Sequence, residues 1–229
     1  MRSANWTENW DRSAQENQDI RLISGWGNRT FQEMLFSIND IAKKLDLQQG
    51  DRLLDIGCGA GLFEIAFAHW AGALFGVDYS REMVKKARTN TCQYDNVNIQ
   101  QCNIKHLPFK TRSFDKILVN SVIQYLDTPD DLGTAMKELN RVIKSGGTIF
   151  LSLIPSASTK QDFLDGYYNL GLSADEIKKK IEINNNILWF YETELINNLK
   201  KIGFSDIILT KPCDNFQKKY YFDIIIVKK

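Results

Sequence analysis

Glycines and carboxylates recur at the ends of short apolar segments in the first half of the chain. Three glycines follow an apolar run in the segment LLDIGCGAG: Gly57, Gly59 and Gly61. A turn rich in glycine exposes backbone N–H groups and has no Cβ to keep a ligand away, and Asp55 lies just before it. Asp78 ends the next apolar segment, where a carboxylate can accept hydrogen bonds from both hydroxyls of a ribose. The pattern predicts a binding site for a ligand that contains a nucleoside.

The spacing of these glycines separates two classes of nucleotide-binding protein. Gly-x-Gly-x-Gly differs from the Gly-x-Gly-x-x-Gly of nicotinamide and flavin proteins. It resembles motif I of the class I S-adenosylmethionine-dependent methyltransferases. The resemblance implies that the loop lies against the methionine part of the cofactor, that Asp55 helps to organise the amino acid moiety, and that Asp78 is the second acidic position. Without a ligand, Asp78 would be a charge at a helix N-terminus, although Ser80 can cap that helix itself.

Two later segments extend the resemblance. In QQCNIKHLPF, Asn103 stands where the family usually has an acidic residue that meets the adenine amino group, and an amide oxygen accepts the same bond without charge assistance. The segment FDKILVNSVIQYL resembles the fourth strand and its motif, which implies that Tyr125 and Gln124 lie near the methyl donor and act as the catalytic residues. The resemblance also implies cofactor contacts from Cys58, Tyr79, Met83, Ile104, Asn120 and Ser121.

Aromatic residues are frequent before the glycine loop, in a part of the chain that the resemblance does not cover. Trp6, Trp10 and Trp26 predict a lid or pocket wall that contacts the substrate together with Tyr125. Arg21 is available in the same region as a contact for an anionic substrate. The alternative, which the sequence leaves open, is that these tryptophans anchor a helix to the core.

Periodicity after Gly50 predicts the fold class. Short apolar runs alternate with helical patterns, which indicates an α/β fold with a doubly wound, mostly parallel, seven-stranded Rossmann-like sheet. The last two apolar segments, SDIILT and YYFDIIIVK, have no predicted helix between them and indicate an antiparallel hairpin at the edge of this sheet. Before the sheet, Thr30 and Glu33 form a potential capping box for an amphipathic helix that extends to Leu45.

The length of 229 residues favours one domain over residues 1–229, because it suffices for one well-buried core but not for two with a linker. Within this domain the patterns predict an N-terminal helical lid or cap, a cofactor-binding core, a helical insertion over the site, and a C-terminal helix with an edge hairpin. These parts cover residues 1–49, 50–154, 155–190 and 191–229 respectively.

Charge and cysteine usage exclude several classes of partner. Lys and Arg total 29 and Asp and Glu 28, and a net charge of +1 gives no general attraction to nucleic acids or anionic membranes. The four scattered cysteines lack metal-ligand spacing, so we expect no metal site. No signal-peptide core or run of about 18 apolar residues is present, and we expect a cytoplasmic protein.

These patterns predict methyl transfer to an oxygen, nitrogen or carbon nucleophile of a small metabolite, with S-adenosylhomocysteine as the product. The in-line reaction needs alignment and exclusion of water, so we expect neither His69 nor His106 to be an essential base. Two alternatives stay open. One is a catalytically inactive S-adenosylmethionine-binding regulatory or assembly protein, and the less favoured one is a nucleotide-dependent oxidoreductase.

Overall fold

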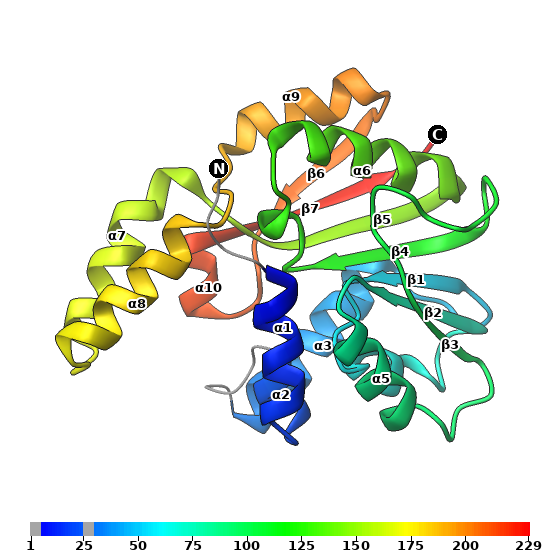
Figure 1. Ribbon diagram of the computed structural model, residues 1–229. Helices are drawn as coiled ribbons and strands as arrows, with labels where there is room; N and C mark the ends of the chain where they lie inside the picture. Colours follow the sequence, from blue (N-terminus) through cyan, green and yellow to red (C-terminus); the bar gives the residue numbers. More distant parts are fainter. Residues whose placement is uncertain (1–5, 25–29) are drawn as a thin grey trace.

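The computed structural model describes residues 6–24 and 30–229, which form a seven-stranded sheet with helices on both faces (Figure 1). The strands are β1 (Arg52–Ile56), β2 (Ala73–Asp78), β3 (Val97–Gln101), β4 (Phe114–Asn120), β5 (Ile143–Pro155), β6 (Asp206–Thr210) and β7 (Tyr221–Val227). The α-helices are α1 (Trp6–Glu16), α2 (Ile20–Ile23), α3 (Phe31–Leu45), α4 (Leu62–Phe67), α5 (Arg81–Asn90), α6 (Pro129–Val142), α7 (Lys160–Asp165), α8 (Ala174–Asn185), α9 (Glu192–Ile202) and α10 (Asn215–Tyr220). Short 3-10 helices are η1 (Ile123–Tyr125), η2 (Ala157–Thr159) and η3 (Gly166–Asn169).

The strand order of the sheet is β3-β2-β1-β4-β5-β7-β6. The strands from β3 to β5 are parallel to their neighbours, and β7 is antiparallel to both β5 and β6. This arrangement confirms the predicted α/β fold and its antiparallel edge. Because the chain leaves β1 toward β2 and later returns to pair β4 on the other side of β1, the carboxyl ends of β1 and β4 flank a crevice of the kind that binds ligands in such sheets.

Two apolar cores hold the helices on the sheet. Helices α6 and α9 pack on one face, and α3 and α4 pack on the other (Figure 1). On the first face Met136 and Leu199 are buried against strand residues such as Ile149, and on the second Leu45 and Phe67 are fully buried. Burial of such side chains contributes about 1.5–3 kcal/mol each, so the sheet forms a rigid platform for the ends of its strands.

Local sequence signals set the helix ends where they were predicted. Thr30 and Glu33 form the reciprocal capping box that begins α3, which ends at Leu45. A second capping box, Ser173 with Glu176, begins α8. Helix α9 ends at Gly203, whose φ of 105° is the left-handed conformation that glycine adopts most easily.

The carboxyl-terminal part differs from the expectation in one element. Helix α10 lies between β6 and β7, in a stretch predicted to be a polar connection. Asp214 caps it by accepting a hydrogen bond from the backbone N–H of Gln217. Six residues are too few for helical periodicity to show in the sequence, and this short helix depends on its cap and on contact with β7.

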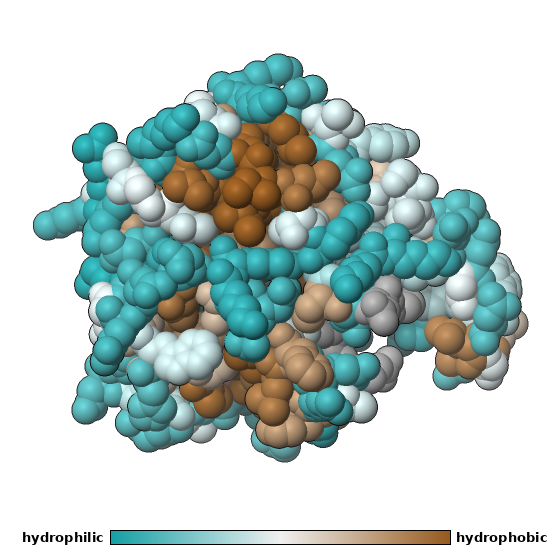
Figure 2. All heavy atoms as spheres, turned by 180° about the vertical axis from the view of Figure 1, so that it is seen from behind, coloured by the Kyte–Doolittle hydropathy of each residue, from teal (hydrophilic) through white to brown (hydrophobic). Residues whose placement is uncertain are grey.

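The surface of the described residues combines polar and apolar areas. Figure 2 shows apolar patches separated by hydrophilic side chains on the face turned away in Figure 1. Exposed apolar side chains occur on α3, where Phe31 and Phe36 lie, and on the edge strand β6, where Ile208 lies. Within residues 6–24 and 30–229, we find no helix with the length and apolar character that a membrane span requires.

Candidate active site

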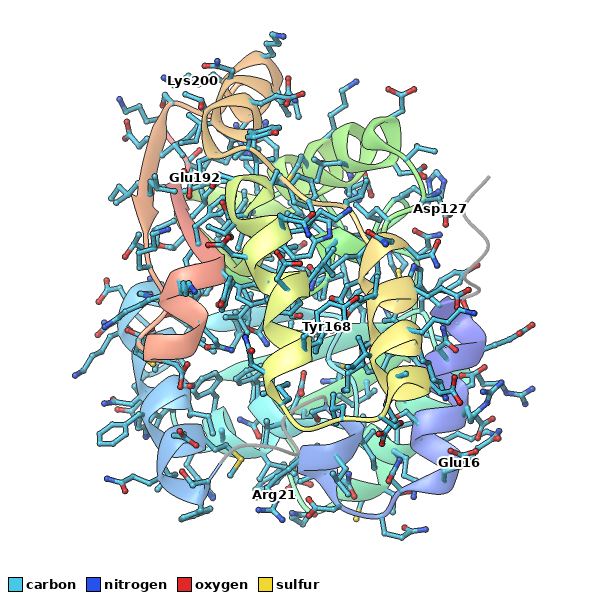
Figure 3. All side chains as sticks on the ribbon, turned by 90° about the vertical axis from the view of Figure 1, so that its left-hand side faces the viewer. Glu16, Arg21, Asp127, Tyr168, Glu192 and Lys200 are labelled. Carbon is cyan, nitrogen blue, oxygen red and sulfur yellow. The ribbon has the colours of Figure 1, made fainter. Side chains whose placement is uncertain are left out.

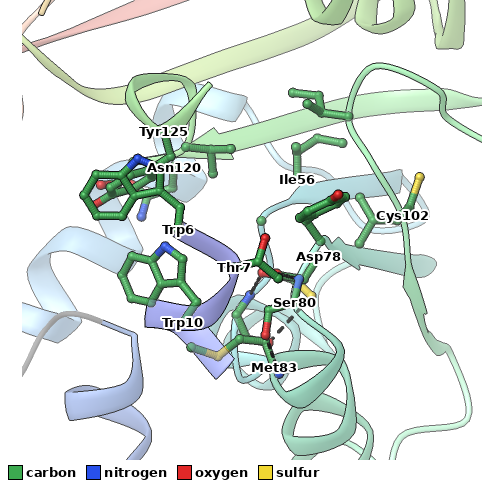
Figure 4. A pocket seen from close by; sticks show the side chains of 18 of the residues that line it. Trp6, Thr7, Trp10, Ile56, Asp78, Ser80, Met83, Cys102, Asn120 and Tyr125 are labelled. Atoms are coloured by element: carbon green, nitrogen blue, oxygen red, sulfur yellow. Dashed lines mark hydrogen bonds between the residues drawn. The ribbon is translucent and has the colours of Figure 1, made fainter. Parts of the chain in front are cut away.

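A cavity of about 530 Å³ opens at the carboxyl ends of β1, β2 and β4, where the strand order reverses (Figure 4). Its walls come from α1, from the glycine-rich loop after β1, from the turn after β2, and from the segments that follow β3 and β4. The volume lies within the usual range for small-molecule and cofactor sites.

The glycine-rich loop turns sharply against the end of β2. The backbone N–H groups of Gly57 and Cys58 both donate to the carbonyl oxygen of Val77, at 2.7 and 3.1 Å. Gly57 has a φ of 72°, and a Cβ at this position would lie 2.4 Å from Cγ2 of Val122. Both the backbone conformation and the close approach of Val122 therefore require glycine.

Asp78 fixes the loop to the next strand. Its carboxylate accepts hydrogen bonds from the backbone N–H groups of Gly59, at 2.9 Å, and Ser80, at 2.8 Å. Burial raises the pKa of Asp78, and backbone hydrogen bonds from Ser80, Gly59 and Tyr79 act in the opposite direction. Because each carboxylate oxygen can accept two hydrogen bonds, Asp78 keeps acceptor capacity at the cavity that it lines.

Helix α1 supplies an aromatic wall. Trp6 and Trp10 are four residues apart, so they project from one face of the helix. The ring centroid of Tyr125 lies 4.8 Å from that of Trp6 and 5.5 Å from that of Trp10, with tilted and edge-on geometries (Figure 4). These are favourable aromatic contacts, and all three residues line the cavity.

Asp11 attaches the same helix to the start of α5. Its carboxylate accepts a short hydrogen bond from the hydroxyl of Ser80 and a second one, at 3.2 Å, from the backbone N–H of Glu82. Ser80 is also the N-cap of α5, since its hydroxyl oxygen accepts from the N–H of Met83 at 3.0 Å. Asp11 therefore lies at the positive end of the α5 dipole, and Ser80 joins it to Asp78 by donating a hydrogen bond to each.

Polar side chains gather after β4. Ser121 has a φ of 57°, which is unusual for a residue with a side chain, and its hydroxyl oxygen accepts from Nε2 of Gln124 at 2.7 Å. Burial raises the pKa of Tyr125, while hydrogen bonds with Ser121 and Gln124 lower it. The Tyr125 hydroxyl therefore stays protonated at neutral pH and is suited to orient a nucleophile, not to remove its proton.

Most residues predicted to bind the cofactor line the cavity: Gly57, Cys58, Gly59, Asp78, Tyr79, Met83, Asn103, Ile104, Asn120 and Ser121. Asp55, at the end of β1, and Gly61, at the end of the loop where α4 begins, do not line the cavity. Gln124 is also absent from the wall, and it contacts the site through Ser121.

The residues predicted to contact the substrate divide into three groups. Trp6, Trp10 and Tyr125 line the cavity, as described above. Arg21 lies outside it because its guanidinium pairs with Asp19 at 2.6 Å, and Figure 3 shows Arg21 well apart from Asp127 of the cavity wall. Trp26 falls outside the described residues.

Several wall residues were not predicted from the sequence: Thr7, Ile23, Ser24, Leu62, Phe63, Ser80, Lys105, Leu126 and Asp127. Thr7 follows Trp6 directly in α1, so the prediction that Trp6 lines a pocket could have included Thr7. Lys105 lies in the segment QQCNIKHLPF but was not itself predicted to reach the cavity. Its ammonium group pairs with Asp131 at 2.8 Å.

These residues fit S-adenosylmethionine. Asp78 offers acceptors for ribose hydroxyls, and apolar side chains such as Met83 and Ile104 offer a surface for adenine. Oδ1 of Asn103 accepts from the N–H of Lys105 at 2.9 Å and has a second lone pair for an amino group. Oδ1 of Asn120 is buried and has no hydrogen-bond partner among the described residues, so it can accept from a bound ligand.

Comparison with known proteins agrees with this fit. A family model described as a methyltransferase domain matches residues 54–151. An uncharacterised protein of Methanocaldococcus jannaschii is 29% identical over 179 residues, which cover 78% of this chain and 76% of that protein. A demethylmenaquinone methyltransferase of Staphylococcus aureus is 31% identical over 112 residues, or 48% of this chain and 45% of that enzyme, so the match spans less than half of its length.

Solved structures show the same fold over the whole chain. The geranyl diphosphate C-methyltransferase of Streptomyces coelicolor, solved with Mg²⁺, geranyl diphosphate and S-adenosyl-L-homocysteine, superposes with a TM-score of 0.69 at 13% identity, covering 99% of this chain and 100% of that one. A methyltransferase of Haloferax volcanii in complex with the activator Trm112 gives 0.66 at 16% identity, covering 96% and 94%. Residues 54–151, with their glycine loop and the acidic end of β2, thus match a methyltransferase domain, and in this part the chain resembles the class I S-adenosylmethionine-dependent methyltransferases.

Proposed function

We propose that this protein transfers the methyl group of S-adenosylmethionine to a nucleophilic atom of a small molecule, mainly by alignment and exclusion of water. One observation carries this proposal. The aromatic wall of Trp6, Trp10 and Tyr125 borders the same cavity as Asp78, so a cofactor held at Asp78 and an acceptor against the rings would share one enclosed space.

The residues around the cavity have distinct roles in this proposal. When bound, S-adenosylmethionine supplies an activated methyl group, which transfers in line to a nucleophile. Asp78 holds the ribose, Asn103 accepts from the adenine amino group, and the Tyr125 hydroxyl orients the acceptor. The thiol of Cys58 takes no part as a nucleophile, because burial raises its pKa well above the ordinary value.

We further propose that α1 is a lid. Its aromatic residues cover the cavity, and it is attached to α5 through Asp11. Departure of the helix would open the cavity for cofactor entry, and its return would exclude water during transfer. Binding of cofactor and acceptor together should therefore slow amide exchange within residues 6–16, which hydrogen exchange measures directly.

The wall residues favour an acceptor with an apolar or aromatic body. Five of the side chains that line the cavity are aromatic, namely Trp6, Trp10, Phe63, Tyr79 and Tyr125, and the ammonium group of Lys105 is already paired with Asp131. The related proteins do not narrow the acceptor further, because one is named for a demethylmenaquinone and another was solved with geranyl diphosphate. A turnover screen with candidate acceptors is therefore the experiment that identifies the acceptor.

Calorimetric binding of S-adenosylmethionine followed by a turnover screen against a metabolite library tests this function. With an acceptor in hand, Tyr125→Phe should lower turnover by more than about tenfold while cofactor affinity stays within about threefold. Tyr168→Phe is the matched control, since Tyr168 is 65% exposed and does not line the cavity; Figure 3 labels it near α7 and α8. Binding without turnover of any compound would instead favour a regulatory or assembly protein.

A further inference from the structure

Two carboxyl groups are buried side by side behind the glycine-rich loop. Asp55 of β1 is 2% exposed and Glu64 of α4 is 0% exposed. The charge of Glu64 acts on Asp55, and none of the four carboxyl oxygens has a hydrogen-bond partner among the described residues. Buried ionisable groups are normally compensated by a partner, so the pair requires an explanation.

The backbone makes room for this pair. Asp55 is in register with Gly76 of β2, so both positions face the helix α4 that carries Glu64. A Cβ on Gly76 would lie 2.5 Å from Oε1 of Glu64 and 3.0 Å from Cβ of Cys58. The missing side chain of Gly76 is therefore the space that the Glu64 carboxyl group occupies beside Asp55.

The charged groups around the pair are acidic. Asp78 of β2 acts on both Asp55 and Glu64, Asp11 of α1 acts on Asp78, and the neighbouring ionisable group of the loop is the Cys58 thiol. Burial raises the pKa of Glu64 to about 8 and that of Asp55 well above its ordinary value, with the charge of Glu64 adding to the latter. At neutral pH the pair therefore holds protons that a nearby cation would displace.

A ligand of the adjacent cavity can bring a cation close to this pair. Gly57 and Cys58 line that cavity. They are separated from Asp55 in the chain by only one residue, Ile56. S-adenosylmethionine carries a sulfonium, an ammonium and a carboxylate group at its methionine end, which leaves one net positive charge there, whereas its adenosine part is neutral. The methionine end is thus the part of the cofactor whose charge the pair can balance across the loop.

The resemblance already implies a role for Asp55 at the amino acid moiety of the cofactor. We propose that Glu64 is the positioning residue for Asp55, that the two carboxyl groups together balance the net positive charge of S-adenosylmethionine, and that cofactor binding releases a proton from the pair to solvent. The inference rests on the proposed function only in its choice of cofactor. The O–H bond of one carboxyl group breaks, the proton passes to buffer, and the remaining carboxyl proton bridges the two groups. The pair then carries one negative charge opposite the cofactor.

Titration calorimetry of the full chain at pH 7, repeated in buffers of different ionisation enthalpy, counts the protons released per ligand. We expect between about 0.5 and 1 proton for S-adenosylmethionine and less than about 0.2 for methylthioadenosine, which lacks the charged methionine end. Glu64→Gln retains the size and a donor for Asp55 but removes one titrating group, so release should fall to less than half. Glu194→Gln, on the exposed part of α9, is the matched control and should match the parent.

The outcomes separate this inference from the cofactor assignment. Equal proton counts for the two ligands in the parent protein, or an unchanged count in a folded Glu64→Gln variant, would overturn the role of the pair while leaving cofactor binding established. If the variant does not fold, the comparison of the two ligands in the parent still decides. Failure of the parent to bind either ligand would overturn the cofactor assignment and the inference together.

Discussion

Asp11→Ala is expected to release α1 from the body of the protein without unfolding the sheet. The substitution removes an acceptor for the Ser80 hydroxyl and for the N–H of Glu82, together with a negative charge at the N-terminus of α5. A hydrogen bond to a charged group contributes about 1.5–3 kcal/mol. Because Asp11 is partly exposed, we take about 1.5–2.5 kcal/mol for its whole contribution, which weakens docking of the helix about 10- to 70-fold.

Hydrogen exchange detected by mass spectrometry measures this opening. Amides of α1 should exchange about 10- to 70-fold faster in Asp11→Ala, whereas α5 should change less because Ser80 continues to cap it through the N–H of Met83. Glu16→Ala is the control, since Glu16 is exposed on the same helix (Figure 3). Exchange of α1 within threefold of the parent in a folded Asp11→Ala protein would refute the attachment through Asp11. Equal acceleration throughout the sheet would show global destabilisation instead.

Five further substitutions test the site and the acidic pair behind it. Asp78→Ala should weaken S-adenosylmethionine binding by about 1.5–3 kcal/mol in calorimetry, because it removes acceptors for the ribose, and an unchanged dissociation constant in a folded variant would contradict the assignment. Asn103→Asp should preserve or strengthen binding in the same assay, since the new acceptor is charged, and loss of binding would place the adenine elsewhere. His69→Ala and His106→Ala should each keep turnover within about tenfold, because both side chains are exposed and neither lines the cavity, and a loss above about a hundredfold would reveal a general base. Glu64→Gln should make the free energy of unfolding, measured by urea titration, fall less steeply as pH rises. The pKa of Glu64 is raised from 4.5 to about 8 in the folded protein, so its contribution to stability is complete below about pH 4.5 and is lost as pH rises through about 8.

The fold was predictable because its signals are local. Apolar runs of strand length alternate with helical patterns, and capping boxes such as Thr30 with Glu33 begin helices where the sequence indicates them. Strand limits were less predictable. Strand β5 begins at Ile143, ahead of the turn-forming Gly146 and Gly147, because Ile143 pairs with Phe114 across the sheet. Such pairing is a long-range contact that local propensity does not encode.

The site was predictable where a motif carried it and not where packing did. The glycine loop and Asp78 are recognisable from spacing, but the contact of Trp6 with Tyr125 joins residues more than a hundred positions apart. Arg21 illustrates the opposite error, since a basic residue in a suitable region pairs with Asp19 instead of pointing to the cavity. Glu64 is the single charged residue of an otherwise apolar helix. This pattern could have indicated a buried functional side chain, but Glu64 was not among the predicted site residues.

The shared space of Gly76 and Glu64 constrains the order in which these two positions can evolve. Adding a methyl group at Gly76 first would press it against Oε1 of Glu64, and overpacking of this kind typically costs about 1–3 kcal/mol. Shortening Glu64 first removes that clash, and the remaining close atom, Cδ1 of Ile99 at 2.7 Å, is the end of a flexible side chain that can move aside for a later side chain at position 76. In the ancestry of this protein and its relatives, we therefore expect loss of the acidic side chain to precede any departure from glycine, so the two sites should covary in that direction.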